Sequence, residues 1–166
     1  LAELSRLRFE EQHDPEIASR IAAYELAFRM QSAAPELMDL SGESQKMIDE
    51  YGVNRTGLQN VVATADSKPR AVSQTFSRNC LLARRLVERG VRFVTIFHGD
   101  WDHHSGLDRG LRQNCEGVDQ PLATLVKDLK QRGLLDTTLI VIASEFGRTP
   151  LGQGNDGRDH HPFAFS

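Results

Sequence analysis

The chain has 166 residues, of which 39% are hydrophobic and 26% charged, with a formal net charge of -3 at pH 7. These values are ordinary for one globular domain with a real core, and the small negative charge gives no general attraction to nucleic acid or anionic membranes. No apolar run approaches the roughly 20 residues of a membrane-spanning helix.

The first 70 residues are expected to be mainly helix and loop. Asp14 and Pro15 predict a helix start, because Asp is a favoured cap and Pro suits the first turn. An amphipathic stripe follows at helical spacing, and Ala33-Ala34-Pro35 is expected to end the helix; the stripe is Ile17, Ile21, Tyr24 and Phe28. A short helix is predicted from Ser44 to Tyr51, and mostly loop over 52–70.

Residues 71–166 have a more regular pattern. A helix is predicted over 72–89, and Gly90 is expected to terminate it; its inward face holds Phe76, Cys80, Ala83 and Val87. Residues 91–97 are β-branched and aromatic and predict a strand. A second helix is expected from about Leu107 to Arg132, with an interruption near Pro121. The nearly all-apolar run 138–143 predicts a buried strand, and 144–166 is expected to be loop.

The expected order is therefore strand, long helical crossover, strand. Such units are parallel and right-handed in nearly all cases. We predict one α/β domain fragment in which residues 71–166 form the βαβ core. Because parallel strands end at the same sheet edge, the loops that follow 97 and 143 are expected to converge there, where open α/β sheets bind ligands.

Five of the six histidines lie in two short loops, one at 98–104 and one at 158–161. Imidazole and carboxylate side chains bind borderline divalent metals and exchange protons near neutral pH. The candidate ligands are Asp100, Asp102, His104, Glu145, and His160 or His161. Adjacent histidines rarely both bind one ion, so one of each pair is expected to support the site indirectly. The alternative is a polar loop with solvated histidines.

The mixture of oxygen and nitrogen ligands favours zinc, manganese or iron over calcium or magnesium. Arg148 and Arg158 are candidates to hold an anionic substrate, with a salt bridge as the alternative for each. Cys80 and Cys115 lie far apart without the spacing of a thiolate zinc site, and they are interpreted as free thiols. Ser105 and Ser144 lack the context of a nucleophile elbow, so the catalytic residue is unknown.

Several segments together resemble a bacterial family known as domain of unknown function 1501. They are Tyr24–Gln31, Cys80–Gly90, Trp101–His104, Asp119–Pro121, Leu129–Leu139, Glu145–Pro150 and Gly157–Pro162. The resemblance spans nearly the whole chain, and its Glu-Phe-Gly-Arg-Thr-Pro and Asp-His-His motifs are fairly specific. The family is in turn similar to the alkaline phosphatase and sulfatase superfamily.

That similarity implies a partial α/β sandwich with metal ions at the carboxyl edge of the sheet and hydrolysis of phosphate or sulfate esters, including those of glycans. It also implies a periplasmic or extracellular location. With the ligand types described above, zinc or manganese is favoured and calcium is left open. Asp100 and His104 match an Asp-x-x-x-His motif, whereas Phe146 replaces a usual ligand. The superfamily's nucleophile is not matched, so we expect a fragment of a longer protein, of unknown oligomeric state. A non-catalytic envelope-associated binding module is the alternative.

Overall fold

The computed structural model describes residues 15–55 and 72–165. The predicted cap at Asp14 and the loop predicted beyond residue 55 therefore lie outside the described residues. The chain divides into two compact units, residues 1–42 and 43–166. Each unit is described separately below.

The first unit contains one long helix, α2 (Pro15–Met38). The predicted end at Ala33-Ala34-Pro35 is wrong, because Pro35 lies inside the helix and its carbonyl accepts a hydrogen bond from the Asp39 amide at 3.0 Å. Pro35 lacks an N–H, but its fixed φ is compatible with a helix that ends soon after it. Tyr24 and Phe28 of the predicted stripe are largely exposed. Within the described residues, no helix is long and apolar enough to cross a membrane.

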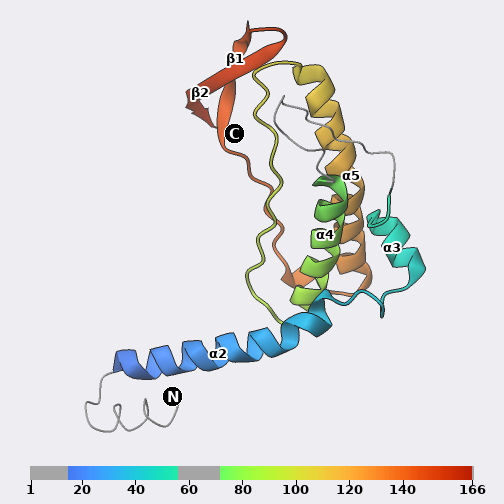
Figure 1. Cartoon of the computed structure of the whole chain (residues 1–166), viewed down its shortest axis with the longest axis vertical. Helices are drawn as coiled ribbons and strands as arrows, with labels where there is room; N and C mark the ends of the chain where they lie inside the picture. Colours follow the sequence, from blue (N-terminus) through green and yellow to red (C-terminus); the bar gives the residue numbers. More distant parts are fainter. Residues whose placement is uncertain (1–14, 56–71, 166) are drawn as a thin grey trace. The chain divides into compact units, whose positions relative to one another are not determined.

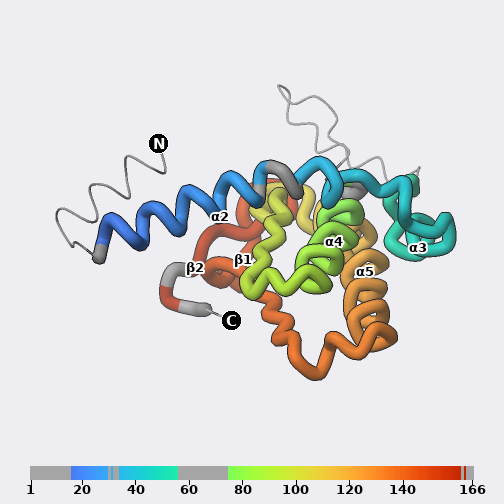
Figure 2. The backbone as a smooth tube through the Cα atoms, turned by 90° about the horizontal axis from the view of Figure 1, so that it is seen from below, coloured from blue at the N-terminus to red at the C-terminus, as the bar shows by residue number. Residues whose placement is uncertain are grey.

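The second unit is built on helices α3 (Gln45–Tyr51), α4 (Val72–Glu88) and α5 (Leu107–Gln131), followed by a short 3-10 helix at Leu135–Thr137. Figures 1 and 2 show α4 and α5 side by side, with α3 near them. Ser44 caps α3 by accepting a hydrogen bond from the Met47 amide, and Gly52 ends it with φ 70°. The three predicted helices are thus confirmed, and α5 continues through Pro121 without the predicted interruption.

The core lies between these helices. The most buried large side chains are Tyr51, Cys80, Leu81, Pro121 and Leu129. Cys80 and Cys115 are free thiols, as predicted. Burial raises the pKa of the Cys80 thiol to about 12, so Cys80 acts as a small apolar side chain.

A buried ionic cluster joins the same helices. The Arg84 guanidinium, 3% exposed, contacts Glu43 at 2.6 Å, Glu88 at 2.7 Å and Asp128 at 3.0 Å. Tyr51 donates a hydrogen bond to Asp128 at 3.0 Å. Because each charge has a partner, the cluster can be buried without leaving an isolated ion, and it fixes α3, α4 and α5 against one another.

The predicted parallel strands are not supported. Residues 91–97 and 138–143 form neither helix nor strand, and Figure 1 draws both as connections. Apolar side chains in them are exposed, including Phe93 at 90%, Phe97 at 86% and Leu139 at 87%. A β-prone sequence becomes a strand only when a neighbouring strand satisfies its backbone, and no described strand pairs with either segment.

The sheet lies where loop was predicted. Strands β1 (Phe146–Gln153) and β2 (Gly157–Phe165) form an antiparallel hairpin, which makes the prediction of loop over 144–166 wrong. A tight turn over Gly154, Asn155 and Asp156 connects them, with φ 55° at Gly154 and 59° at Asp156. Gly, Asn and Asp tolerate this left-handed backbone. The fold is therefore mixed helix and sheet, and the finer claim of a parallel sandwich is not part of it.

Candidate metal centre

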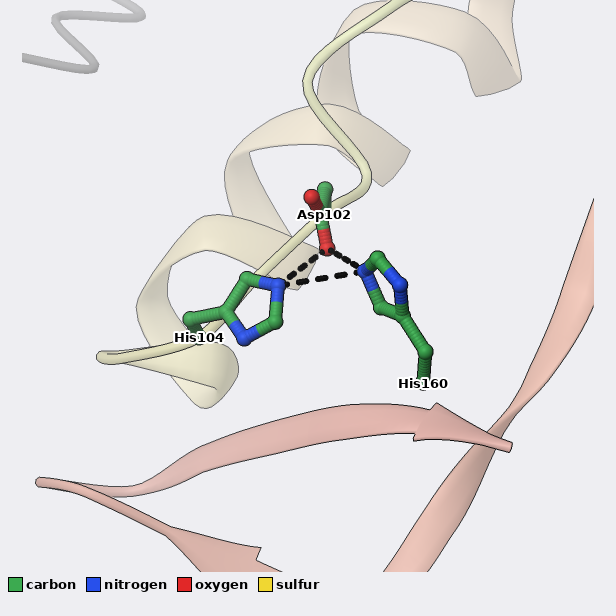
Figure 3. A group of neighbouring side chains, drawn as sticks. All are labelled: Asp102, His104 and His160. Atoms are coloured by element: carbon green, nitrogen blue, oxygen red, sulfur yellow. Dashed lines mark hydrogen bonds and ion pairs between the residues drawn. The ribbon is translucent and has the colours of Figure 1, made fainter. Parts of the chain in front are cut away.

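Three side chains from distant parts of the sequence converge at the hairpin. Asp102 and His104 come from the loop before α5, and His160 comes from β2 (Figure 3). The Asp102 Oδ1 atom lies 2.9 Å from His104 Nε2 and 3.0 Å from His160 Nε2. The two Nε2 atoms are 3.2 Å apart. All three side chains are about half exposed, so the group is open to solvent.

The separations suit a small metal ion. Ligands bound to zinc at about 2.0–2.2 Å in a tetrahedral arrangement lie about 3.3–3.6 Å from one another, slightly farther apart than the three atoms here. His104 Nδ1 lies 2.7 Å from Gln153 Oε1. If Nδ1 donates to this amide oxygen, Nε2 carries the lone pair toward Asp102 and His160. A proton or a cation must then lie among the converging lone pairs, because acceptor atoms this close otherwise repel.

Backbone contacts hold the His104 loop against the hairpin. The Arg158 amide donates to the His103 carbonyl at 3.0 Å, and the Gly106 amide donates to the Asn155 carbonyl at 3.0 Å. A Cβ at Gly157 would lie 2.0 Å from the His104 carbonyl oxygen, so only glycine permits this approach. The hairpin thereby carries His160 to within reach of His104.

Electrostatics keep the carboxylate ionised. A hydrogen bond from His160 lowers the pKa of the Asp102 carboxyl below its ordinary value, and the Arg148 guanidinium lowers it further. Arg148 Nη1 lies 2.5 Å from Asp102 Oδ1, and Nη2 lies 2.7 Å from Glu145 Oε1. The guanidinium carbon also lies 5.5 Å from the centre of the Phe146 ring. Arg148 is therefore immediately beside the three converging groups.

Other predicted site residues lie elsewhere. Glu145 pairs with Arg148 and is not in the group of three. His161 faces away from His160, because neighbouring residues in a strand point to opposite faces, and its ring lies edge-on to Phe163. Asp100 is exposed at φ 68° and is likewise outside the group. Arg158 donates to the Gly157 carbonyl at 2.7 Å, within the hairpin.

The remaining loop histidines pack against nonpolar groups. The His98 ring lies 5.1 Å edge-on from Phe76 and 5.5 Å from Trp101. Burial lowers the pKa of His98. Trp101 is 37% exposed. The His103 ring occupies the space beside Gly110, where a Cβ would lie 2.2 Å from it.

Two contributors to the site were missed from the sequence. Gln153 positions the His104 ring, and Gly157 admits the His104 backbone. An isolated glutamine carries no metal-site signature, and its role depends on hairpin register. The Asp156-Gly157 pair, in contrast, is a turn signal that could have indicated the hairpin.

The fold and the site thus define a mixed helix and sheet protein with an Asp-His-His group between the loop before α5 and the hairpin. The chain belongs to the family described as "Protein of unknown function (DUF1501)", whose model matches residues 1–166. The search of curated proteins and the search of solved structures found no match.

Proposed function

We propose that the chain is the metal-binding portion of a hydrolase-like protein that acts on phosphate or sulfate esters. The observation that carries the proposal is the convergence of Asp102, His104 and His160 within 4.8 Å of one another, with Arg148 adjacent. Two imidazoles and one carboxylate form a ligand set found in catalytic zinc sites, which keep a further position open for water or substrate. Zinc or manganese fits this set best, and calcium fits least well.

Each residue of the site would have a separate role that follows from its side-chain chemistry. His104, oriented by Gln153, and His160, carried by β2, supply nitrogen ligands, and Asp102 supplies a charged oxygen. A bound ion would polarise the ester oxygen and favour attack on the phosphorus or sulfur atom. Arg148 presents two N–H donors in one plane, the geometry that matches a phosphate or sulfate group. The ester of a small molecule or of a glycan would meet this site at the surface, since the three ligands are half exposed.

The similarity to alkaline phosphatases and sulfatases supports the same reading. In a sandwich of that superfamily, residues 91–97 and 138–143 would be parallel strands of a larger sheet. Their exposed apolar side chains would then be covered by the rest of the sheet and its helices. The nucleophile would come from a part of the protein outside this sequence. A periplasmic or extracellular location also belongs to this proposal and rests on the similarity alone.

One observation favours a non-catalytic binding module instead. The Phe146 ring lies 4.4 Å from the His160 ring, where the superfamily similarity implies a second set of ligands. Such a module would bind an anionic glycan or a protein in the cell envelope without cleaving it.

The test uses the full-length protein that contains this chain. Metal content is measured after loading with zinc and with manganese, for the wild type and for the Asp102→Asn and His104→Ala variants. Turnover of aryl phosphates and aryl sulfates is then measured with and without a chelator. One bound ion that both substitutions remove, together with chelator-sensitive turnover, supports the hydrolase. Stoichiometric metal without turnover supports the binding module, and no stoichiometric metal overturns both.

A further inference from the structure

We propose that Arg148 is a latch that makes metal binding and oxyanion binding cooperative. The proposal rests on the metal centre proposed above and adds a rule for how that centre is regulated. In the structure, the Arg148 guanidinium holds both Asp102 and Glu145. It therefore occupies the carboxylate that the metal ion needs.

The Arg148 guanidinium and a bound metal ion would compete for one atom, Asp102 Oδ1. This single oxygen lies 2.5 Å from Arg148 Nη1, 2.9 Å from His104 Nε2 and 3.0 Å from His160 Nε2. A metal ion among the three ligands takes a lone pair of this oxygen and also repels the guanidinium charge. The guanidinium therefore opposes metal binding through charge repulsion and through competition for Oδ1, and we expect Nη1 to move away from Oδ1 when the metal binds.

Once displaced, the guanidinium has a defined place. In the structure, Nη2 already contacts Glu145 at 2.7 Å and the guanidinium carbon lies 5.5 Å from the centre of the Phe146 ring, and both contacts would keep the displaced guanidinium beside the site. The side chain is 22% exposed, so surrounding groups restrict its movement. The released N–H donors are then available beside the metal ion for a tetrahedral oxyanion, which can contact both positive charges.

A bound anion offsets the repulsion between the metal ion and the Arg148 guanidinium. With sulfate or phosphate between them, Arg148 no longer needs Asp102 as its partner, and the metal binds Asp102 without competition. Since coupling between two binding sites is reciprocal, the metal tightens anion binding by the same factor that the anion tightens metal binding.

The experiment is a calorimetric titration of the full-length protein with Mn²⁺, with and without sulfate, at constant ionic strength. In the wild type we expect sulfate to tighten Mn²⁺ binding by about 5-fold or more, the lower range of ordinary coupling. In Arg148→Gln, Mn²⁺ alone should bind more tightly than in the wild type, and sulfate should have no effect. Arg112→Gln is the matched control, because Arg112 is an exposed arginine that pairs with Asp108 on α5; it should keep the wild-type coupling.

The outcomes separate this proposal from the one on which it rests. If Mn²⁺ binds and Asp102→Asn weakens it, while Arg148→Gln neither tightens Mn²⁺ nor abolishes the sulfate effect, the latch is overturned and the metal centre stands. If Mn²⁺ does not bind, or binds equally well in Asp102→Asn, the metal centre itself is overturned and the latch with it.

Discussion

Replacing Gly157 with alanine should separate the two halves of the metal centre. The new Cβ would lie 2.0 Å from the His104 carbonyl oxygen and 2.7 Å from the Ser105 amide nitrogen. Ordinary contacts begin at about 3.5 Å, so the two backbones must separate by about 1.5 Å. These are backbone atoms, which cannot rotate away as the end of a side chain can.

The separation has an energetic cost that can be estimated. The bonds from the Arg158 amide to His103 and from the Gly106 amide to Asn155 each contribute about 1 kcal/mol, and overpacking typically costs about 1–3 kcal/mol. The two costs overlap, because moving the two backbones apart relieves the overpacking but breaks the hydrogen bonds. We therefore expect the docking of the loop on the hairpin to weaken by about 2–4 kcal/mol. A loss of 2 kcal/mol corresponds to about 30-fold in affinity, so metal binding should weaken by at least that factor.

The assay is a zinc titration, accompanied by circular dichroism of the helices. The helical signal should remain, because the buried cluster around Arg84 does not involve the hairpin. Gly152→Ala is the matched control, because among the residues that the structure describes a Cβ there would meet only the Arg158 Nη1 atom, at 4.0 Å. Wild-type zinc affinity in Gly157→Ala would refute the reasoning that this close approach builds the site.

Three further predictions concern pH and stability. Burial lowers the pKa of His98 below its ordinary value of 6.5, so the neutral ring is favoured. The contribution of His98 to stability is therefore present above pH 6.5 and lost as pH falls through the lower folded pKa. An NMR titration that gives His98 a pKa of 6.5 or higher would contradict this. The contacts with His160 and Arg148 lower the pKa of Asp102, so its contribution to stability is present above its unfolded pKa of about 3.9 and lost as pH falls through the lower folded pKa. A 13C NMR titration should find the midpoint of its carboxyl below about 3.9, and a normal or raised value would be inconsistent with the Arg148 and His160 contacts. Arg84→Met removes the buried cation shared by Glu43, Glu88 and Asp128, although Arg85 and Arg132 still pair with these carboxylates, and it should cost about 3 kcal/mol in urea unfolding, the low end for breaking a buried pair. Arg112→Met, at an exposed pair, should have little effect; equal effects of the two substitutions would show that the buried cluster is not stabilising.

The helices were predictable because their signals are local. Ser44 and Gly52 bracket α3, and apolar residues recur at helical spacing in α4 and α5. Pro35 and Pro121 were misleading, since both are accommodated within helices. A proline weakens a helix, but packing of the rest of the helix can outweigh that local loss, as the burial of Pro121 shows.

The strands were not predictable in the same way. Residues 91–97 and 138–143 have the composition of strands, yet a strand requires a partner whose position the local sequence does not specify. The hairpin at 146–165 has polar and glycine-rich strands without alternating apolar residues. The local signal for this hairpin was the run Gly154-Asn155-Asp156-Gly157, whose residue types favour a tight turn.

The candidate site was partly predictable. Asp102, His104 and His160 were among the residues selected by type, and the structure brings these three together. Residue type alone could not choose between His160 and His161, because that choice depends on which face of β2 each occupies. Nor could it place Arg148 on Asp102, which depends on the register of the hairpin against the preceding loop.

The most direct test of the metal centre compares two adjacent histidines. Zinc is titrated into the full-length protein carrying His160→Ala or His161→Ala. The substitutions are chemically identical and lie one residue apart, but only the His160 ring lies within 3.2 Å of His104 and Asp102. We predict that His160→Ala abolishes stoichiometric zinc binding and that His161→Ala retains it. Equal binding by the two variants, or loss only in His161→Ala, would contradict the proposed centre.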